Sequence, residues 1–180
     1  MKNSLINRIC LYLMSGMVVV ILGASDSYAA IPKNLPSQSL QNFLPEGSFR
    51  GGGAGTGFSL LGVKRVYSTD RKSERLIFEI GDKEGKPYSG KPGYFHAQLF
   101  KNPSEFSLDF SQLVRSHVSS DQVRSLVKNS KLIDRINLVT DKEDHSTNLF
   151  MRFKSPVTMR MFILSPKKKS PKLVVDIRKI

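Results

Sequence analysis

The 180-residue sequence contains one cysteine, no tryptophan and only three histidines. A single cysteine cannot form a disulfide within the chain, which excludes a disulfide-stabilised scaffold. Only one apolar run approaches membrane length, and it lies at the N-terminus, so a protein that crosses the membrane several times is excluded. Acidic residues are also scarce, 15 against 28 lysines and arginines, for a formal net charge of +13. With 39% hydrophobic residues, the chain has enough apolar material for one packed domain.

The first 29 residues have the pattern of a secretory signal peptide. Lys2 and Arg8 form a basic start, residues 9–24 are mainly apolar, and small residues precede an expected cleavage site after Ala29. An uncleaved anchor helix is the alternative, but the apolar run is short for a full span. After cleavage 26 basic and 14 acidic residues remain, a net charge of +12. We therefore expect a periplasmic or exported protein with no transmembrane segment after cleavage, whose charge favours polyanionic partners.

Residues 30–57 have the composition of a tail and linker. The first part is rich in proline and has no sustained period, with Phe43 and Leu44 as an expected docking point. The glycine-rich run 51–57 lacks the Gly-Lys-Ser/Thr of a phosphate-binding loop and follows no predicted strand. We interpret it as a flexible linker.

Alternating apolar and polar residues predict eight strands in the folded part, residues 58–180. The clearest example is Arg75–Ile80, in which Leu76, Phe78 and Ile80 share one face. A short helix is predicted over residues 119–128, with Ser119 or Ser120 as its N-cap. The strands are predicted near residues 63–67, 75–80, 94–100, 106–110, 133–139, 148–153, 157–164 and 173–177.

The two halves of this pattern match in order, which indicates an internal duplication of a four-stranded unit. Arg75–Ile80 corresponds to Asn148–Phe153, and Phe106–Phe110 corresponds to Leu173–Ile177. Val63 and Val66 are aligned with Ile133 and Ile136, the Asp70 turn with that at Asp141, and the Pro103 turn with that at Pro166. The predicted fold is all-β: a β-sandwich of two symmetric four-stranded sheets, with the one short helix between the halves.

From about Leu60 to Lys179 the chain resembles the AMIN domain of bacterial envelope proteins, a module of cell-wall amidases and type IV pilus secretins that also occurs alone. The resemblance rests on short segments: Arg75–Ile80, Gly93–His96, Asn102–Pro103, Leu108–Phe110 and Pro171–Ile177. It implies a β-sandwich of two symmetric four-stranded sheets and a role in binding peptidoglycan or docking to envelope machinery. Lys172 stands where the family often has arginine, and the insertion that carries the helix is larger than expected.

The sequence offers no catalytic motif. His96, His117 and His145 do not have the spacing of metal ligands, and no Gly-x-Ser-x-Gly motif is present. Asp109 and Asp176 occupy equivalent places in the two halves, and we expect each to order a turn or pair with an arginine rather than form a glycosidase-type pair. We therefore expect a protein that is not an enzyme and holds neither a metal nor a cofactor.

Binding by outward-facing basic residues is the function that remains. Peptidoglycan or another anionic envelope polymer is the expected partner, since arginine and lysine donate charge-assisted hydrogen bonds to carboxylates and phosphates. The alternative is a protein-docking adaptor of a pilus, secretion or division complex. Nucleic acid is not an expected partner of an exported chain, and one tyrosine is no stacking platform. Lys64 and Arg65 are further outward candidates, and Lys167–Lys169 is interpreted as a solvated turn. The candidate ligand-binding residues are Arg75, Tyr94, Arg135, Arg152, Arg160 and Lys172.

Overall fold

A computed structural model describes residues 42–55, 57–68, 72–141, 146–165 and 169–180. The predicted signal peptide, the tail up to residue 41, the Asp70 turn, His145, Pro166 and two of the three lysines at 167–169 lie outside the described residues. The elements are β1 (Gly47–Gly51), β2 (Phe58–Tyr67), β3 (Ser73–Gly81), β4 (Phe95–Phe100), β5 (Glu105–Phe110), β6 (Leu113–Ser116), α1 (Ser120–Val127), β7 (Ile133–Thr140), β8 (Thr147–Phe153), β9 (Val157–Leu164) and β10 (Lys172–Lys179).

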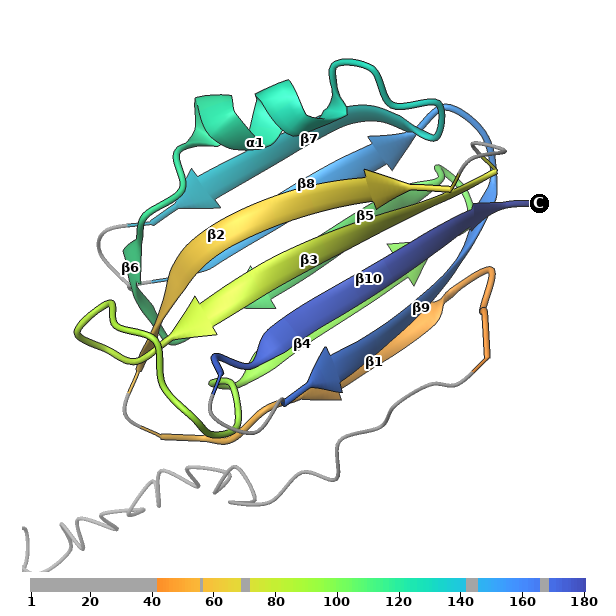
Figure 1. The fold of residues 1–180 in the computed structure, drawn as a ribbon. Helices are drawn as coiled ribbons and strands as arrows, with labels where there is room; N and C mark the ends of the chain where they lie inside the picture. Colours follow the sequence, from red (N-terminus) through yellow and green to blue (C-terminus); the bar gives the residue numbers. More distant parts are fainter. Residues whose placement is uncertain (1–41, 56, 69–71, 142–145, 166–168) are drawn as a thin grey trace, which may run out of the picture. The chain divides into compact units, whose positions relative to one another are not determined.

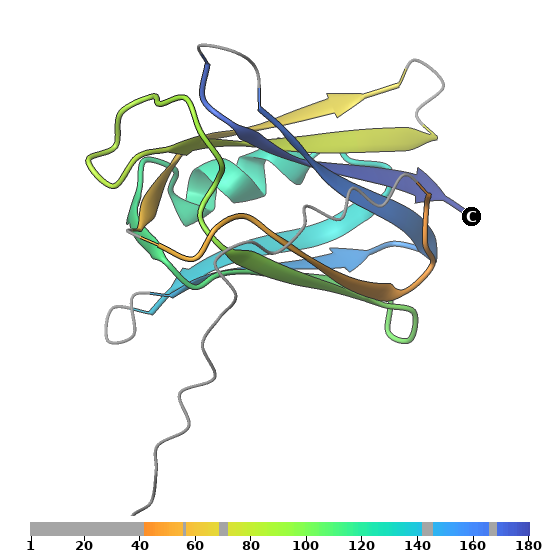
Figure 2. The same ribbon diagram turned by 90° about the horizontal axis from the view of Figure 1, so that it is seen from below.

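The strands form two facing sheets, which confirms the predicted all-β sandwich (Figures 1 and 2). Sheet A has the order β6-β2-β3-β10-β9, and sheet B has the order β1-β4-β5-β8-β7. All strand pairs are antiparallel except β2–β6. Each sheet has five strands rather than the four that were predicted, because β1 and β6 each add a strand to one edge.

The internal duplication is visible in the strand order. Strands β2, β3, β4 and β5 of the first half correspond in order to β7, β8, β9 and β10 of the second. Replacing each strand of the run β2-β3-β10-β9 in sheet A by its counterpart gives β7-β8-β5-β4, which is the order found in sheet B. The central pairs agree in register, since Arg75 lies opposite Asp176 and Asn148 lies opposite Asp109. Each sheet therefore contains two strands from each half of the chain.

One part of the predicted alignment between the halves is off by three residues. Val63 lies opposite Phe78, and Ile136 lies opposite Met151, so Val63 is equivalent to Ile136 rather than to Ile133. Short alternating strings of apolar residues align almost equally well at several registers. Pairing with the next strand, which the sequence does not display, decides between them.

The core lies between the sheets and is built from the faces that the alternation predicted. Leu76, Phe78 and Ile80 are buried from sheet A, and Phe106, Leu108 and Phe110 are buried from sheet B. Two aromatic contacts cross between the sheets: the Phe110 ring centroid lies 5.8 Å from that of Phe58 and 5.9 Å from that of Phe78, both edge to face. Outward residues of the same strands are left free to carry charge.

Residues 42–55 belong to the folded domain, whereas the sequence indicated a tail and linker. Phe43 and Leu44 dock as expected, because Leu44 exchanges two backbone hydrogen bonds of 2.8 Å with Met159. β1 then pairs with β4 and buries Phe49. Gly52 has φ +83°, and a Cβ there would lie 2.0 Å from the Gly93 carbonyl oxygen. This glycine permits close passage of two backbone segments rather than flexibility.

The one helix in the described part of the chain, α1, covers the side of the sandwich where β7 and β2 lie (Figure 1). Ser119 is the N-cap and forms a capping box with Gln122, as the Ser119/Ser120 pattern predicted. Val123 and Val127 face the core. Among the described residues no helix has the length and apolarity needed to cross a membrane.

Candidate functional site

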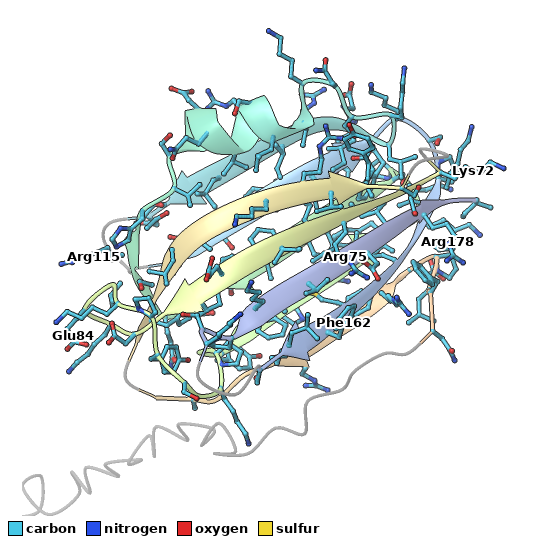
Figure 3. The ribbon with its side chains drawn as sticks, in the orientation of Figure 1. Lys72, Arg75, Glu84, Arg115, Phe162 and Arg178 are labelled. Atoms are coloured by element: carbon cyan, nitrogen blue, oxygen red, sulfur yellow. The ribbon has the colours of Figure 1, made fainter. Side chains whose placement is uncertain are left out.

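The outer face of sheet A carries a cluster of three arginines around one carboxylate. Arg75 on β3, Arg160 on β9 and Asp176 on β10 are cross-strand neighbours in register. Arg178 lies two residues after Asp176, so it emerges from the same face of β10. With the rings of Phe43 and Phe162, these side chains form what we call the arginine cluster; Figure 3 labels Arg75, Phe162 and Arg178 on this side of the molecule.

Two of the arginines share the carboxylate of Asp176. Arg75 is bidentate, with Nε 2.5 Å from Oδ1 and Nη2 2.9 Å from Oδ2. Arg160 places both Nε and Nη2 2.8 Å from Oδ2. The Asp176 side chain is only 9% exposed, whereas Arg75 and Arg160 are 41% and 33% exposed. The carboxylate is therefore enclosed by guanidinium groups that still have surface facing solvent.

The arginines hold Asp176 in its ionised form. Burial by itself raises the pKa of this carboxyl, but the hydrogen bonds and charges of Arg75 and Arg160 outweigh it and lower the pKa below its ordinary value. The hydrogen bonds to Asp176 in turn raise the pKa of Arg75. Three guanidinium groups and one carboxylate leave the arginine cluster a net charge of +2 at neutral pH.

Aromatic rings support the guanidinium groups. The Cζ atoms of Arg75 and Arg160 lie 5.7 and 5.5 Å from the Phe162 ring centroid. Arg160 and Arg178 lie 4.9 and 4.2 Å from the Phe43 ring centroid. Such cation–π contacts fix the planes of the arginines with little loss of their capacity to donate hydrogen bonds. A hollow of about 250 Å³ lies beside them, with Tyr67 and Val66 on its wall.

The outer face of sheet B has a different character at the equivalent positions. Asn148 takes the place of Arg75, His96 takes that of Arg160, and Asp109 takes that of Asp176. Asp109 accepts a hydrogen bond of 2.8 Å from the Ser111 hydroxyl, and its buried Oδ1 has no hydrogen-bond partner among the described residues. The two-fold-related site therefore lacks both arginines, and the concentration of positive charge belongs to sheet A.

Sheet B instead presents an apolar surface. Phe100 and Phe150 are 43% and 48% exposed beside a hollow of about 370 Å³. Arg135 and Arg152 face each other in register at its border, and Arg152 pairs with Glu105 at 3.2 Å. This surface therefore combines exposed aromatic side chains with two arginines, one of which is paired with a carboxylate.

The sequence-predicted candidates thus fall on opposite faces of the sandwich. Arg75 and Arg160 are brought together in the arginine cluster. Lys172 is the first residue of β10, four residues before Asp176, and therefore lies on the same face of the sheet. Arg135 and Arg152 lie on sheet B. Tyr94 is half-buried just before β4 and lines neither hollow.

The sequence predicted that Arg65 points outward, and this prediction is wrong. Its side chain is 11% exposed and donates to the buried Glu74 at 3.0 Å. Conversely, sequence reasoning missed Arg178 and Phe162, and it named Phe43 only as a docking point and not as a neighbour of the arginines. The period of two from Asp176 to Arg178 is a signal that points to the first, whereas the two phenylalanines become neighbours only through strand pairing.

The structure separates Asp109 and Asp176 onto different sheets, and Asp176 pairs with arginine as predicted. A carboxyl held ionised by two arginines is a poor proton donor. Within the described part of the chain, no three metal-ligating side chains gather in one place. No protein-family model matches the chain, and no curated protein matches it with significance.

Proposed function

We propose that this protein is a non-catalytic binding module of the bacterial envelope that holds peptidoglycan, or another anionic wall polymer, on the outer face of sheet A. The observation that carries the proposal is the sharing of one enclosed carboxylate by two partly exposed arginines. Asp176 fixes the two guanidinium groups in place but neutralises only one of them. Both arginines remain partly exposed, so their other N–H donors can bind an anion from a fixed position.

Three further features support this function. The chain has a net charge of +13, and its first residues have the pattern of an export signal. Segments that form β3 and β10 carry the resemblance to the AMIN domain. The aromatic rings beside the arginines hold the guanidinium planes in position for an incoming anionic group.

The proposal is tested by co-sedimentation of the protein with purified, protein-free cell-wall sacculi. We expect binding at about 0.05 M salt and a marked loss at about 0.5 M, because salt screens contacts between exposed charges. The variant R75Q/R160Q/D176N/R178Q removes the net charge of the cluster but keeps polar groups at every position. It should bind at least about tenfold more weakly, as expected for the loss of two charge-assisted contacts.

A matched control comes from the other face. R135Q/R152Q also lowers the net charge by two, but on sheet B, and should leave sacculus binding within about twofold of wild type. Equal losses in both variants would mean that only the overall charge matters. Absence of co-sedimentation of the wild type at low salt would refute the proposal.

A protein-docking adaptor is the second candidate function. The exposed Phe100 and Phe150 on sheet B favour it, because exposed apolar patches mark protein interaction surfaces. Association through this surface would be insensitive to salt. It would be abolished by F100S/F150S, and R75Q/R160Q/D176N/R178Q would leave it intact.

A further inference from the structure

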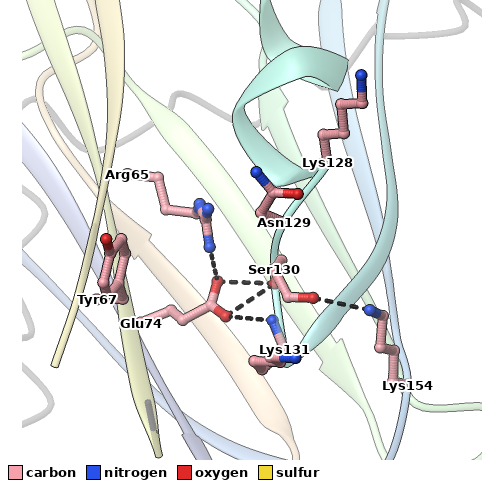
Figure 4. A pocket seen from close by; sticks show the side chains of 8 residues that line it. All are labelled: Arg65, Tyr67, Glu74, Lys128, Asn129, Ser130, Lys131 and Lys154. Atoms are coloured by element: carbon pink, nitrogen blue, oxygen red, sulfur yellow. Dashed lines mark hydrogen bonds and ion pairs between the residues drawn. The ribbon is translucent and has the colours of Figure 1, made fainter. Parts of the chain in front are cut away.

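A second basic hollow lies at the side of the sandwich, where the chain passes from α1 to β7. It has a volume of about 460 Å³ and is lined by residues from β2, β3, the α1–β7 loop and the segment after β8. Four cations line it, Arg65, Lys128, Lys131 and Lys154, and Glu74 is the single carboxylate among the described residues of its wall (Figure 4). Its lysines do not belong to the arginine cluster.

The carboxylate of Glu74 is buried and compensated by donors within the protein. The Glu74 side chain is 2% exposed and accepts hydrogen bonds from the Ser130 hydroxyl at 2.8 Å on both oxygens. The backbone N–H groups of Lys131 and Leu132 donate to Oε1 at 2.9 and 3.2 Å, and Arg65 donates to Oε2 at 3.0 Å. An anion entering the hollow therefore meets a carboxylate that is already neutralised and shielded.

The same hydrogen bonds make the loop rigid. Ser130 lies between Lys128 and Lys131, and its hydroxyl also accepts from the Ile133 N–H at 2.7 Å. Lys154 donates from Nζ to the Ser130 carbonyl at 2.7 Å, which leaves two of its three N–H donors for another partner. No described carboxylate forms an ion pair with Lys128, Lys131 or Lys154. Three lysines thus line one concave space, and none of them forms an ion pair with a carboxylate of the described residues.

We propose that this lysine pocket, formed by Lys128, Lys131 and Lys154, binds a phosphate monoester or pyrophosphate group. A group with two or more negative charges matches three ammonium ions, and lysine acts on phosphate as a compact point charge. The volume accommodates more than the phosphoryl group alone, so a small phosphorylated molecule fits.

Isothermal titration calorimetry of the full chain tests the pocket with four probes: sodium pyrophosphate, glucose 1-phosphate, citrate and acetate. We expect binding of pyrophosphate and glucose 1-phosphate; the tighter of the two indicates whether the site prefers a free or a sugar-linked phosphate. K128A/K131A should weaken that binding at least about tenfold. K86A/K91A removes the same charge from the exposed β3–β4 loop and should change the affinity less than about twofold.

Three results would overturn the proposal. They are absence of phosphate binding by the wild type, equal weakening by the two double variants, and binding of citrate at least as tight as that of pyrophosphate. Denaturant unfolding of K128A/K131A checks that the variant is folded. Because sacculus binding depends on the arginine cluster, K128A/K131A should leave the co-sedimentation result unchanged, so failure of one proposal is distinguishable from failure of the other.

Discussion

At the scale of single residues, two buried carboxylates organise the basic surface of this protein. Asp176 fixes Arg75 and Arg160 on the outer face of sheet A, and Glu74 fixes Arg65 and the α1–β7 loop. Neither role could be predicted in full from the sequence. Alternation along β3 predicted that Arg75 points outward. It did not predict the partners of the adjacent Glu74, because they come from a loop more than fifty residues away in the sequence.

The first prediction concerns the pH dependence of stability. Burial raises the pKa of Glu74 and of Asp176, but hydrogen bonds, from Ser130 and Arg65 in one case and from two arginines in the other, lower each pKa overall. A carboxyl with a lowered folded-state pKa contributes stability that is complete above its unfolded value, near about 4, and is lost as the pH falls through the folded value.

The melting temperature should therefore fall steeply between about pH 5 and about pH 2. In D176N the neutral-pH melting temperature should be lower, and the decrease over the same pH range should be smaller, because one of the titrating groups is gone. Calorimetric scans at several pH values measure both. Parallel curves for D176N and wild type would contradict this account.

The second prediction concerns Glu74 itself. E74Q removes the charge that Arg65 and the loop N–H groups require, and it should lower the free energy of unfolding by about 2–4 kcal/mol. The control is E84Q, since Glu84 is 53% exposed and its pair with Lys83 is long, at 3.8 Å; it should cost less than about 0.5 kcal/mol. Urea unfolding compares them, and equal effects would show that the buried network contributes nothing.

At the scale of elements, the predicted strands and helix are confirmed where alternation and capping are strong. β1 and β6 escaped prediction for a physical reason: each buries few side chains on the core side, Phe49 in a glycine-rich string and Leu113 in a strand of four residues. What holds such edge strands is backbone pairing with a neighbour, which leaves little trace in hydrophobic periodicity.

The third prediction tests whether β1 is an integral part of the domain. F49A should lower the free energy of unfolding by about 3 kcal/mol, because it removes an aromatic side chain that is 2% exposed from the core. Its exposed neighbour Ser48 provides the control, and S48A should cost less than about 0.5 kcal/mol. If the free energy of unfolding of F49A, measured in urea, equals that of the wild type, residues 42–55 are a linker and not part of the domain.

At the scale of the whole molecule, the duplication could be predicted from the order of elements. The strand register confirms it, because Arg75 lies opposite Asp176 in one sheet and the equivalent residues Asn148 and Asp109 lie opposite each other in the other sheet. The difference between the two faces could not be predicted, because it depends on which strands become neighbours. Pairing of β9 with β10 adds Arg160 to one site, and pairing of β4 with β5 adds His96 to the other. The two sheets thus differ in their outer faces, with clustered arginines on sheet A and exposed phenylalanines on sheet B.

The most direct test of the binding face is an NMR titration of the isotope-labelled full chain with soluble anionic peptidoglycan fragments. We expect the largest chemical-shift changes at Arg75, Arg160 and Arg178 and at their neighbours on β3, β9 and β10, and their disappearance at high salt. Changes centred on Phe100 and Phe150 of sheet B, or no changes at saturating fragment concentration, would contradict the assignment of polymer binding to sheet A.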